Sequence, residues 1–205
     1  RITAVDHDVV EESNLNRQLL CREGDVGRRK VDAARERVAA VNTAVELTTL
    51  AECVGEARLL ELLAEADVAV DALGGLATRG ALERAAGAAG VPLVTAAVAG
   101  WTGYVAVVLP GRVGPSALLG SSGGPGCDVG GTTSGRAGST PAAEDVLGCP
   151  APAVAFAASL QAAWVTRVLT RRLTAVGQVE GPDQTAGSML VFDLMEPRFD
   201  VISLP

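Results

Sequence analysis

The residues best able to do chemistry lie close together near the start of the chain. A short apolar run ends in Asp6, and Asn14, Arg17 and Gln18 follow in a polar stretch before Lys30. A carboxylate at the carboxyl end of a strand can accept hydrogen bonds from ribose hydroxyls. Arginine supplies a forked, permanent cation and lysine a compact one, and both hold phosphates and neutralise charge in phosphoryl transfer. The segment is therefore a candidate nucleotide site.

The same residues also have simpler explanations. An aspartate at a strand end is often a turn residue, and the basic run 28–30 can be a solvated helix start rather than a phosphate clamp. His7, the only histidine in the sequence, lies between Asp6 and Asp8. It can sense pH or act as a general base, but we favour a strand-end residue without a catalytic task.

Apolar patterning predicts the elements that position this segment. Strands alternate with helices whose apolar residues recur at three- and four-residue steps, and most of the turns between them are short. The predicted strands are 2–6, 45–50, 68–73, 92–98, 103–109, 188–194 and 199–204, and the predicted helices are 27–41, 57–66, 78–89 and 153–171. This order indicates a Rossmann-like, doubly wound α/β fold with a mainly parallel sheet, helices on both faces, and C-terminal strands that can pair antiparallel.

We expect a single nucleotide-binding domain over residues 1–205, because this length suits one domain with a substantial core. Residues 111–148 change in character, with eight glycines between positions 120 and 138 mixed with serine, threonine and proline. This composition predicts a flexible, glycine-rich crossover loop within the domain. Such a loop can be a lid over a site or a plain insertion.

Composition argues against several classes of protein. The 17 basic and 24 acidic residues give a net charge of −7, which disfavours a nucleic-acid partner. The four cysteines are widely spread without a C-x-x-C pair, which suits a reducing, cytoplasmic location rather than a secreted disulfide framework. The longest uncharged apolar run, about 151–165, is short for a membrane span and predicts a buried helix. We therefore expect no membrane partner.

The order of motifs along the chain resembles a known family. The first motifs are Asp6-x-Asp8, Ser13-Asn14-Leu15-x-Arg17-Gln18 and Val26-Gly27-x-x-Lys30. The likeness continues through Val41-Asn42, the strand 68–73, Thr78-Arg79, Val91-Pro92-Leu93-Val94, Gly100, Gly103-Tyr104-Val105, Gly148, Ser159-Leu160-Gln161-Ala162 and Val191-Phe192-Asp193. On these motifs the chain resembles the ThiF/MoeB/HesA family, the bacterial relatives of ubiquitin-activating enzymes.

The resemblance implies an ATP-dependent adenylyltransferase. Members of the family activate the C-terminal carboxylate of a small ubiquitin-like sulfur carrier protein, modifier or peptide as acyl-AMP and release pyrophosphate. The resemblance implies that Asp6 contacts the ribose and that Lys30 contacts the phosphates. The phosphate side of the site would be lined by Asn14, Arg17 and Gln18, and Asp8 would lie beside these residues. Arg17 and Lys30 would be the catalytic cations. The resemblance also implies ATP and Mg²⁺ as cofactors, the carrier as partner, and a homodimer.

The position of the metal ligand departs from the family pattern. Relatives carry D-x-x-D-N after the strand 68–73, and the second acid is the one linked to the metal. The corresponding stretch reads Asp71-Ala72-Leu73-Gly74-Gly75, so that a glycine replaces the second acid. Because Mg²⁺ requires oxygen ligands, either Asp71 takes the catalytic and metal-binding role or metal-assisted chemistry is impaired. A strand-end cap is a further interpretation of Asp71.

Three other departures are expected from the same resemblance. A first strand with its G-x-G-G-x-G loop, which relatives carry, is expected to be absent. The paired C-x-x-C motifs that bind structural zinc in relatives have no counterpart, so we predict no zinc. Glu144 falls at the position of the reactive crossover-loop cysteine, so Cys127 or Cys149 either substitutes for it or is a buried, inert thiol.

Three functions therefore compete. The first is an adenylyltransferase acting on a small carrier protein or peptide. The second is a catalytically degenerate relative that keeps the scaffold and serves as a partner-binding subunit. The third, a nicotinamide-dependent oxidoreductase on a similar fold, would need a glycine fingerprint and explains none of residues 14–30. We favour the first.

Overall fold

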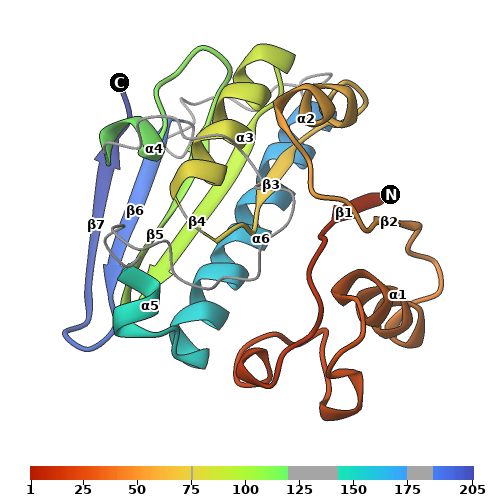
Figure 1. Ribbon diagram of the computed structural model, residues 1–205. Coiled ribbons are helices and arrows are strands. Elements are labelled where there is room, and N and C mark those ends of the chain that lie inside the picture. The colour runs from red at the N-terminus through yellow and green to blue at the C-terminus, as the bar shows by residue number, and fades with distance from the viewer. Residues whose placement is uncertain (75, 120–142, 175–186) are drawn as a thin grey trace. The chain divides into compact units, whose positions relative to one another are not determined.

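A computed structural model of the chain describes residues 1–74, 76–119, 143–174 and 187–205 (Figure 1). These residues belong to two compact units, Arg1–Val54 and Gly55–Pro205, and each is described by itself. The expectation of one domain over residues 1–205 stays a prediction.

The first unit is built on two short parallel strands. β1 (Ile2–Val5) pairs with β2 (Leu47–Leu50) along its whole length. The chain between them forms two 3₁₀ turns, Glu12–Asn14 and Glu23–Asp25, and the helix α1 (Lys30–Val41). The helix contacts β2 and buries Val31, Ala33 and Ala34. This strand–helix–strand arrangement is the crossover that a parallel pair requires.

The helix α1 begins three residues later than its apolar periodicity predicts. Gly27 has a φ of 85°, a left-handed conformation that glycine adopts at little cost. Val9 forms an antiparallel bridge with Arg29, so residues 27–29 are used in pairing with the segment after β1. The helix therefore starts at Lys30, which lies on its first turn.

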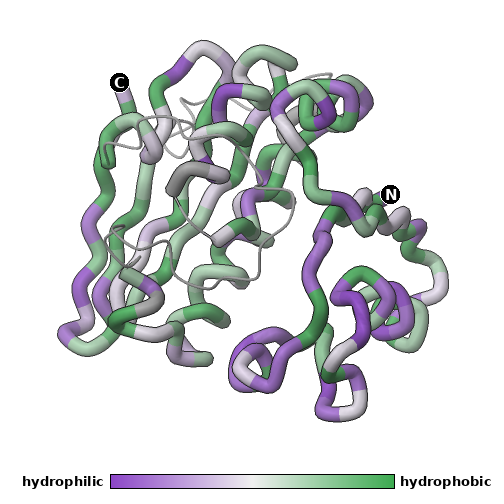
Figure 2. The backbone as a smooth tube through the Cα atoms, viewed as in Figure 1, coloured by the Kyte–Doolittle hydropathy of each residue, from purple (hydrophilic) through white to green (hydrophobic). Residues whose placement is uncertain are grey.

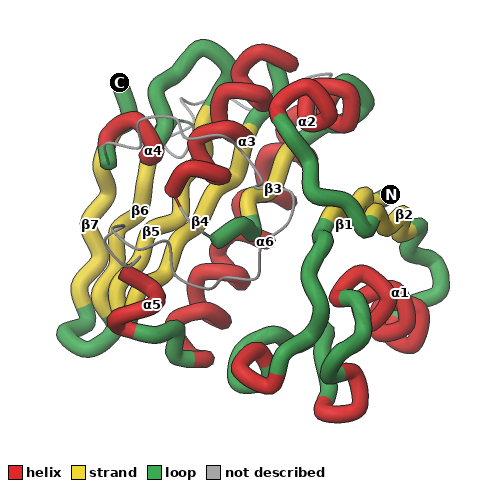
Figure 3. Tube along the Cα trace, viewed as in Figure 1, coloured by secondary structure: helices red, strands yellow, loops and turns green. Residues whose placement is uncertain are grey.

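The second unit contains a five-stranded sheet in the order β3-β4-β5-β6-β7 (Figure 3). The strands are β3 (Ala69–Asp71), β4 (Leu93–Ala99), β5 (Thr102–Val108), β6 (Ser188–Asp193) and β7 (Arg198–Ser203). β3 is parallel to β4, and every later pair is antiparallel. The central strands β4 and β5 are mostly apolar (Figure 2), as expected for strands that are covered on both faces.

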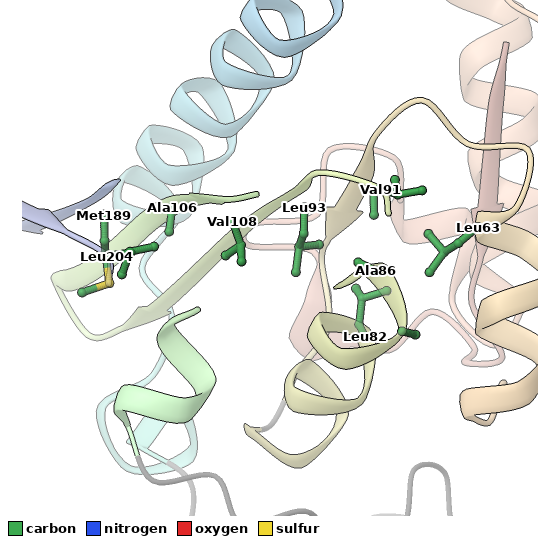
Figure 4. Packing of buried hydrophobic residues seen from close by; sticks show 11 residues of the cluster. Leu63, Leu82, Ala86, Val91, Leu93, Ala106, Val108, Met189 and Leu204 are labelled. Atoms are coloured by element: carbon green, nitrogen blue, oxygen red, sulfur yellow. The ribbon is translucent and has the colours of Figure 1, made fainter. Parts of the chain in front are cut away.

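Helices cover both faces of this sheet. They are α2 (Glu56–Leu63), α3 (Leu76–Ala89), α4 (Pro115–Leu118), α5 (Ala143–Leu147) and α6 (Ala151–Thr174). On one face Leu82 and Ala86 of α3 pack with Leu63 of α2 and with Leu93 and Val108 of the sheet (Figure 4). On the other face α6 packs against a second cluster that includes Val94, Val105 and Phe192. Adjacent residues of a strand thus pack against the helices on opposite faces of the sheet.

The helix α6 is longer and less buried than the sequence predicts. It spans 24 residues, and its segment Ala151–Thr170 is long and apolar enough to cross a membrane by length and composition alone. Among residues 151–170, whose side chains the structure describes, Ala153, Ala157 and Gln161 are buried, and the helix packs against β4 and β5. It is therefore one layer of the second unit, with its other side exposed, rather than a fully buried helix.

The α/β class predicted from the sequence is confirmed, with parallel and antiparallel strands and helices on both faces of the larger sheet. Antiparallel pairing already begins at β4–β5, so the described sheet is less parallel than predicted. Within the predicted crossover loop, the short helices α4 and α5 form at residues 115–118 and 143–147, while residues 120–142 lie outside the described residues.

Candidate functional site

The segment between β1 and α1 is held together by backbone hydrogen bonds. The Val10 amide donates to the Arg28 carbonyl at 2.8 Å, and the Gly27 amide donates to the Val10 carbonyl at 2.9 Å. The Lys30 amide donates to the Asp8 carbonyl at 3.0 Å. Val10, with 1% of its surface exposed, is the buried anchor of this pairing. The polar residues that follow β1 are therefore brought to the first turn of α1.

Three of the predicted site residues meet where β1 ends. The Lys30 ammonium lies 2.8 Å from Asp8 Oδ2, and Asp6 Oδ1 accepts a hydrogen bond from the Asp8 amide at 2.8 Å. The Lys30 side chain is 17% exposed, whereas that of Asp8 is 52% exposed. The cation is thus held in place by a carboxylate that can still reorient in water. Asp6 and Asp8 keep acceptor capacity beyond these contacts.

Asp6, His7 and Asp8 also form a group of possible metal ligands. One ligand atom from each of the three lies within 4.8 Å of the other two, and His7 Nε2 is 3.4 Å from Asp8 Oδ1. His7 and Asp8 are exposed, and the Lys30 ammonium already neutralises Asp8. A bound cation would therefore have to compete with Lys30, so the group is better arranged for an ion pair.

Asn14, Arg17 and Gln18 form a separate turn. Asn14 is buried, and its side-chain oxygen accepts a hydrogen bond from the Glu11 amide at 3.2 Å. Arg17 Nη1 donates to the Ser13 carbonyl at 2.8 Å. These contacts give Asn14 a role in holding the turn, while Arg17 stays accessible. Their partners lie within the turn and differ from those of Asp6, Asp8 and Lys30.

Cys21 connects these two groups, and the sequence-based prediction missed it. Its thiol lies 3.6 Å from Gln18 Oε1 and is only partly exposed. Burial raises the pKa of the Cys21 thiol; the Lys30 cation lowers it, and the carboxylates of Asp25 and Asp6 raise it again. Cys21 therefore lies within electrostatic range of Lys30 and Asp6. Its position three residues after Gln18 was the signal available in the sequence.

The neighbouring arginine of the basic run is already paired. Arg28 Nη1 lies 2.6 Å from Asp25 Oδ1, and its guanidinium also pairs with Glu36. The hydrogen bond from Arg28 holds the pKa of Glu36 below its usual value. Arg28 is therefore a tie between the 3₁₀ turn and α1, which leaves Lys30 as the better candidate for phosphate contact.

Asp71, the remaining predicted residue, belongs to the second unit and is 1% exposed. Its Oδ2 accepts hydrogen bonds from Arg79 Nη1 at 2.8 Å and from Thr95 Oγ1 at 2.6 Å. Its Oδ1 accepts a hydrogen bond from the Leu73 amide at 2.9 Å. Arg79 also donates to the Ala96 carbonyl. Both carboxylate oxygens are thus engaged inside the protein.

Gln161 and Tyr104 extend this buried polar cluster. Gln161 Nε2 donates to the backbone carbonyls of Asp71 and Val94, at 2.7 and 3.0 Å, and so ties α6 to the last residue of β3 and to the start of β4. Burial raises the pKa of the Tyr104 hydroxyl, while the Arg79 cation lowers it and the Asp71 carboxylate raises it again.

The raised pKa of Tyr104 predicts a stability change in alkali. An unfolded tyrosine loses its proton near pH 10, whereas the folded Tyr104 keeps it to a higher pH. This stabilising contribution is complete below about pH 10 and is lost as the pH rises through the folded pKa. Because the chain has one tyrosine, absorbance of tyrosinate at about 295 nm reports this group alone. A folded midpoint at or below that of the urea-unfolded chain would contradict the prediction.

The thiol candidates of the crossover region are only partly described. Cys149 is half-buried, and its thiol lies 3.8 Å from the Val98 carbonyl. Glu144 is half-buried in α5, and its carbonyl accepts a hydrogen bond from the Gly148 amide at 2.9 Å. Cys127 lies outside the described residues. A reactive role for either cysteine stays a prediction.

Comparison with curated proteins identifies relatives of known type. The molybdopterin-synthase adenylyltransferase of Escherichia coli (strain K12) is 35% identical over 106 residues, which cover 52% of this chain and 43% of the relative. The sulfur carrier protein ThiS adenylyltransferase of the same organism is 33% identical over 109 residues, covering 53% and 43%. The matches thus span less than half the length of these relatives.

Solved structures and family models extend the match to the whole chain. The crystal structure of E. coli MccB with ATP has a TM-score of 0.70 at 18% identity and covers 98% of this chain and 55% of that one. At this identity the likeness shows the fold. The model of the ThiF family matches residues 1–205. The chain therefore belongs to the ThiF family, as its motifs indicated.

Proposed function

We propose that this chain carries nucleotide-binding residues of an ATP-dependent adenylyltransferase. Its substrate would be the C-terminal carboxylate of a small ubiquitin-like sulfur carrier protein or a peptide, and its product the acyl-AMP. The observation that carries the proposal is the joining of Asp6, Asp8 and Lys30 at the end of β1. Both relatives described above are named as adenylyltransferases, and one of them as acting on a sulfur carrier protein, which supports the same class of reaction.

The reaction needs charge neutralisation more than covalent help from the protein. A carrier carboxylate oxygen forms a bond to the α-phosphorus of ATP, and the bond from that phosphorus to the oxygen of the leaving pyrophosphate breaks. Lys30 would neutralise charge that develops on the phosphates, because a compact ammonium is suited to this task. Asp6 would accept hydrogen bonds from the ribose, and Arg17 would add a second cation on the phosphate side.

Lys30 has a further property that favours it for this role. It is the only lysine in a chain that carries 16 arginines. Its pairing with Asp8 holds the ammonium at the end of β1 before any ligand arrives, and the exposed Asp8 carboxylate can yield that cation to a phosphate. Asp8 would then reorient into water without leaving a buried charge.

Replacing Lys30 by alanine should weaken ATP binding about tenfold or more, the equivalent of roughly 1.4 kcal/mol. The loss has two causes: the phosphates lose a cation, and the unpaired Asp8 carboxylate adds repulsion. Calorimetric titration of the chain with ATP measures the effect. Arg17→Ala should also weaken binding, whereas Arg37→Ala, which removes an exposed cation from the same helix, should not.

A second measurement uses the single lysine. An amine-selective reagent followed by peptide mass analysis should modify Lys30, and ATP should protect it, while the α-amino group provides the internal control. ATP binding that is equally strong in Lys30→Ala and in the wild type would rule out the assigned role. If the wild-type chain did not bind ATP, the proposal that this chain acts as an ATP-dependent adenylyltransferase would be wrong.

The engaged carboxylate of Asp71 favours a second candidate function, a scaffold that binds nucleotide or partner without turnover. Pyrophosphate exchange with a carrier protein discriminates between the two: the enzyme incorporates labelled pyrophosphate into ATP and the scaffold does not. A homodimer is proposed for either case, by analogy with the family, and sedimentation velocity tests it.

A further inference from the structure

We infer that Asp71 is a positioning residue that anchors Arg79, and that the Mg²⁺ site of the family does not fit this chain. The inference deepens the proposed function and rests on it, since it concerns the acid that the family resemblance offers as the ligand of Mg²⁺. The main observation is the state of the carboxylate. Asp71 is 1% exposed, and its two oxygens accept three hydrogen bonds from protein donors.

The donors around Asp71 leave little capacity for a cation. Oδ2 faces the Arg79 guanidinium at 2.8 Å and the Thr95 hydroxyl at 2.6 Å. A divalent ion on this oxygen would sit beside a permanent positive charge, and the side chain of Arg79 is itself only 12% exposed. Mg²⁺ prefers octahedral oxygen coordination with several waters, which a nearly closed site does not admit.

No second acid compensates at the adjacent position. Gly74, which stands where relatives carry the metal-linked acid, contributes no side-chain oxygen. A Cβ built on Gly74 meets nothing within 4 Å, so the absence of an acid there does not result from a lack of space. In the described part of the second unit, the carboxylate at the end of β3 thus has its hydrogen bonds within the protein.

The hydrogen bonds of Asp71 shape the chain at the carboxyl end of β3. Asp71 is the last residue of β3, and Arg79, which it holds, donates to the Ala96 carbonyl on β4. The Leu73 amide on Oδ1 sets the direction of the chain that leaves β3. In open α/β sheets ligands bind beyond the carboxyl ends of parallel strands, which is where β3 and β4 end. Asp71 therefore shapes this edge through Arg79 instead of touching a ligand.

Titration with Mn²⁺, observed by electron paramagnetic resonance, tests the inference on the whole chain. Binding of Mn²⁺ to the wild type should be weak, and its apparent Kd should agree within about twofold with that of Asp71→Asn, while the melting midpoint of the variant should fall by roughly 5–10 °C. The control Glu196→Gln, which neutralises an exposed acid in the β6–β7 turn, should change neither quantity. A structural anchor moves the midpoint, whereas a metal ligand moves the Kd.

A milder variant keeps the test decisive if Asp71→Asn does not fold. Thr95→Val removes one donor and leaves the carboxylate charged, and its Mn²⁺ affinity should also match that of the wild type. Loss of a bound Mn²⁺ in Asp71→Asn, with the melting midpoint unchanged, would overturn the inference. The inference would also be overturned if Mg²⁺ raised the melting midpoint of the wild type but not that of Asp71→Asn. Neither readout requires ATP, so failure of the proposed nucleotide site gives a different result.

Discussion

Replacing Gly103 by alanine should destabilise the second unit by about 3 kcal/mol. A Cβ at this position would lie within van der Waals overlap of the Ala97 carbonyl oxygen and of the Phe192 ring, where 2.5 Å would separate it from Cζ. The carbonyl belongs to the β4–β5 ladder, in which Tyr104 faces Ala97, and Phe192 is 1% exposed. Neither neighbour is a flexible side-chain end, so the strand itself must shift.

Urea denaturation monitored by tryptophan fluorescence measures this effect, since both tryptophans belong to the second unit. Gly87→Ala is the matched control. Gly87 lies within α3, is exposed, and a Cβ there meets nothing within 4 Å. Alanine at this helical position should stabilise the chain by about 0.5–1 kcal/mol. A Gly103→Ala variant as stable as the wild type would show that β4 and β5 pack less closely than the structure indicates.

The second large effect is expected for Arg79→Leu, which should cost roughly 3–5 kcal/mol of unfolding free energy. The substitution leaves the Asp71 carboxylate buried with its charge uncompensated and removes a donor from the Ala96 carbonyl. Thr95 and the Leu73 amide still donate to Asp71, so part of the carboxylate's solvation survives. Equilibrium denaturation in urea provides the measurement.

Two comparisons separate this effect from loss of an ordinary surface charge. Arg84 lies on α3, as Arg79 does, and its Nη2 is 3.5 Å from Oε2 of Glu56 on α2 in an exposed pair. Arg84→Leu should therefore change stability by less than about 0.5 kcal/mol. Adding Asp71→Asn to Arg79→Leu should recover part of the loss, because the buried charge is then gone. If the double variant were as unstable as the sum of the single ones, the two side chains would not act as a pair.

The elements of this fold could be predicted from sequence because their patterns are local. The apolar, β-branched runs of β4 and β5 and the helical periodicity of α1 and α3 depend on residues within a few positions of each other. The observed bounds differ from the predicted ones where pairing with a distant segment competes with the local pattern. The helix α1 starts at Lys30 because residues 27–29 form hydrogen bonds with the segment after β1. The antiparallel β4–β5 pair was missed because strand direction depends on the short turn at Gly100 and Trp101.

The site was predicted in part for the same reason. Asp6, Asp8 and Lys30 come together because one strand end and one helix start are joined by pairing along the chain. The role of Cys21 depends on burial, which raises its thiol pKa and which no spacing reveals. The environment of Asp71 depends on Thr95, 24 positions away, and Arg79, so motif matching identified the residue but not its partners.

The two carbonyls held by Gln161 limit any redesign of the second unit. Position 161 lies on a helix that also buries the small, apolar Ala153 and Ala157, and an engineer would be inclined to make the whole face apolar. A leucine there would leave the Asp71 and Val94 carbonyls without their donor, and a glutamate would place a negative charge against both. Gln161 thus combines a side chain long enough to reach the strands with a donor group for both carbonyls. One amide group therefore adds a directional contact between α6 and the sheet to the apolar packing of the two layers.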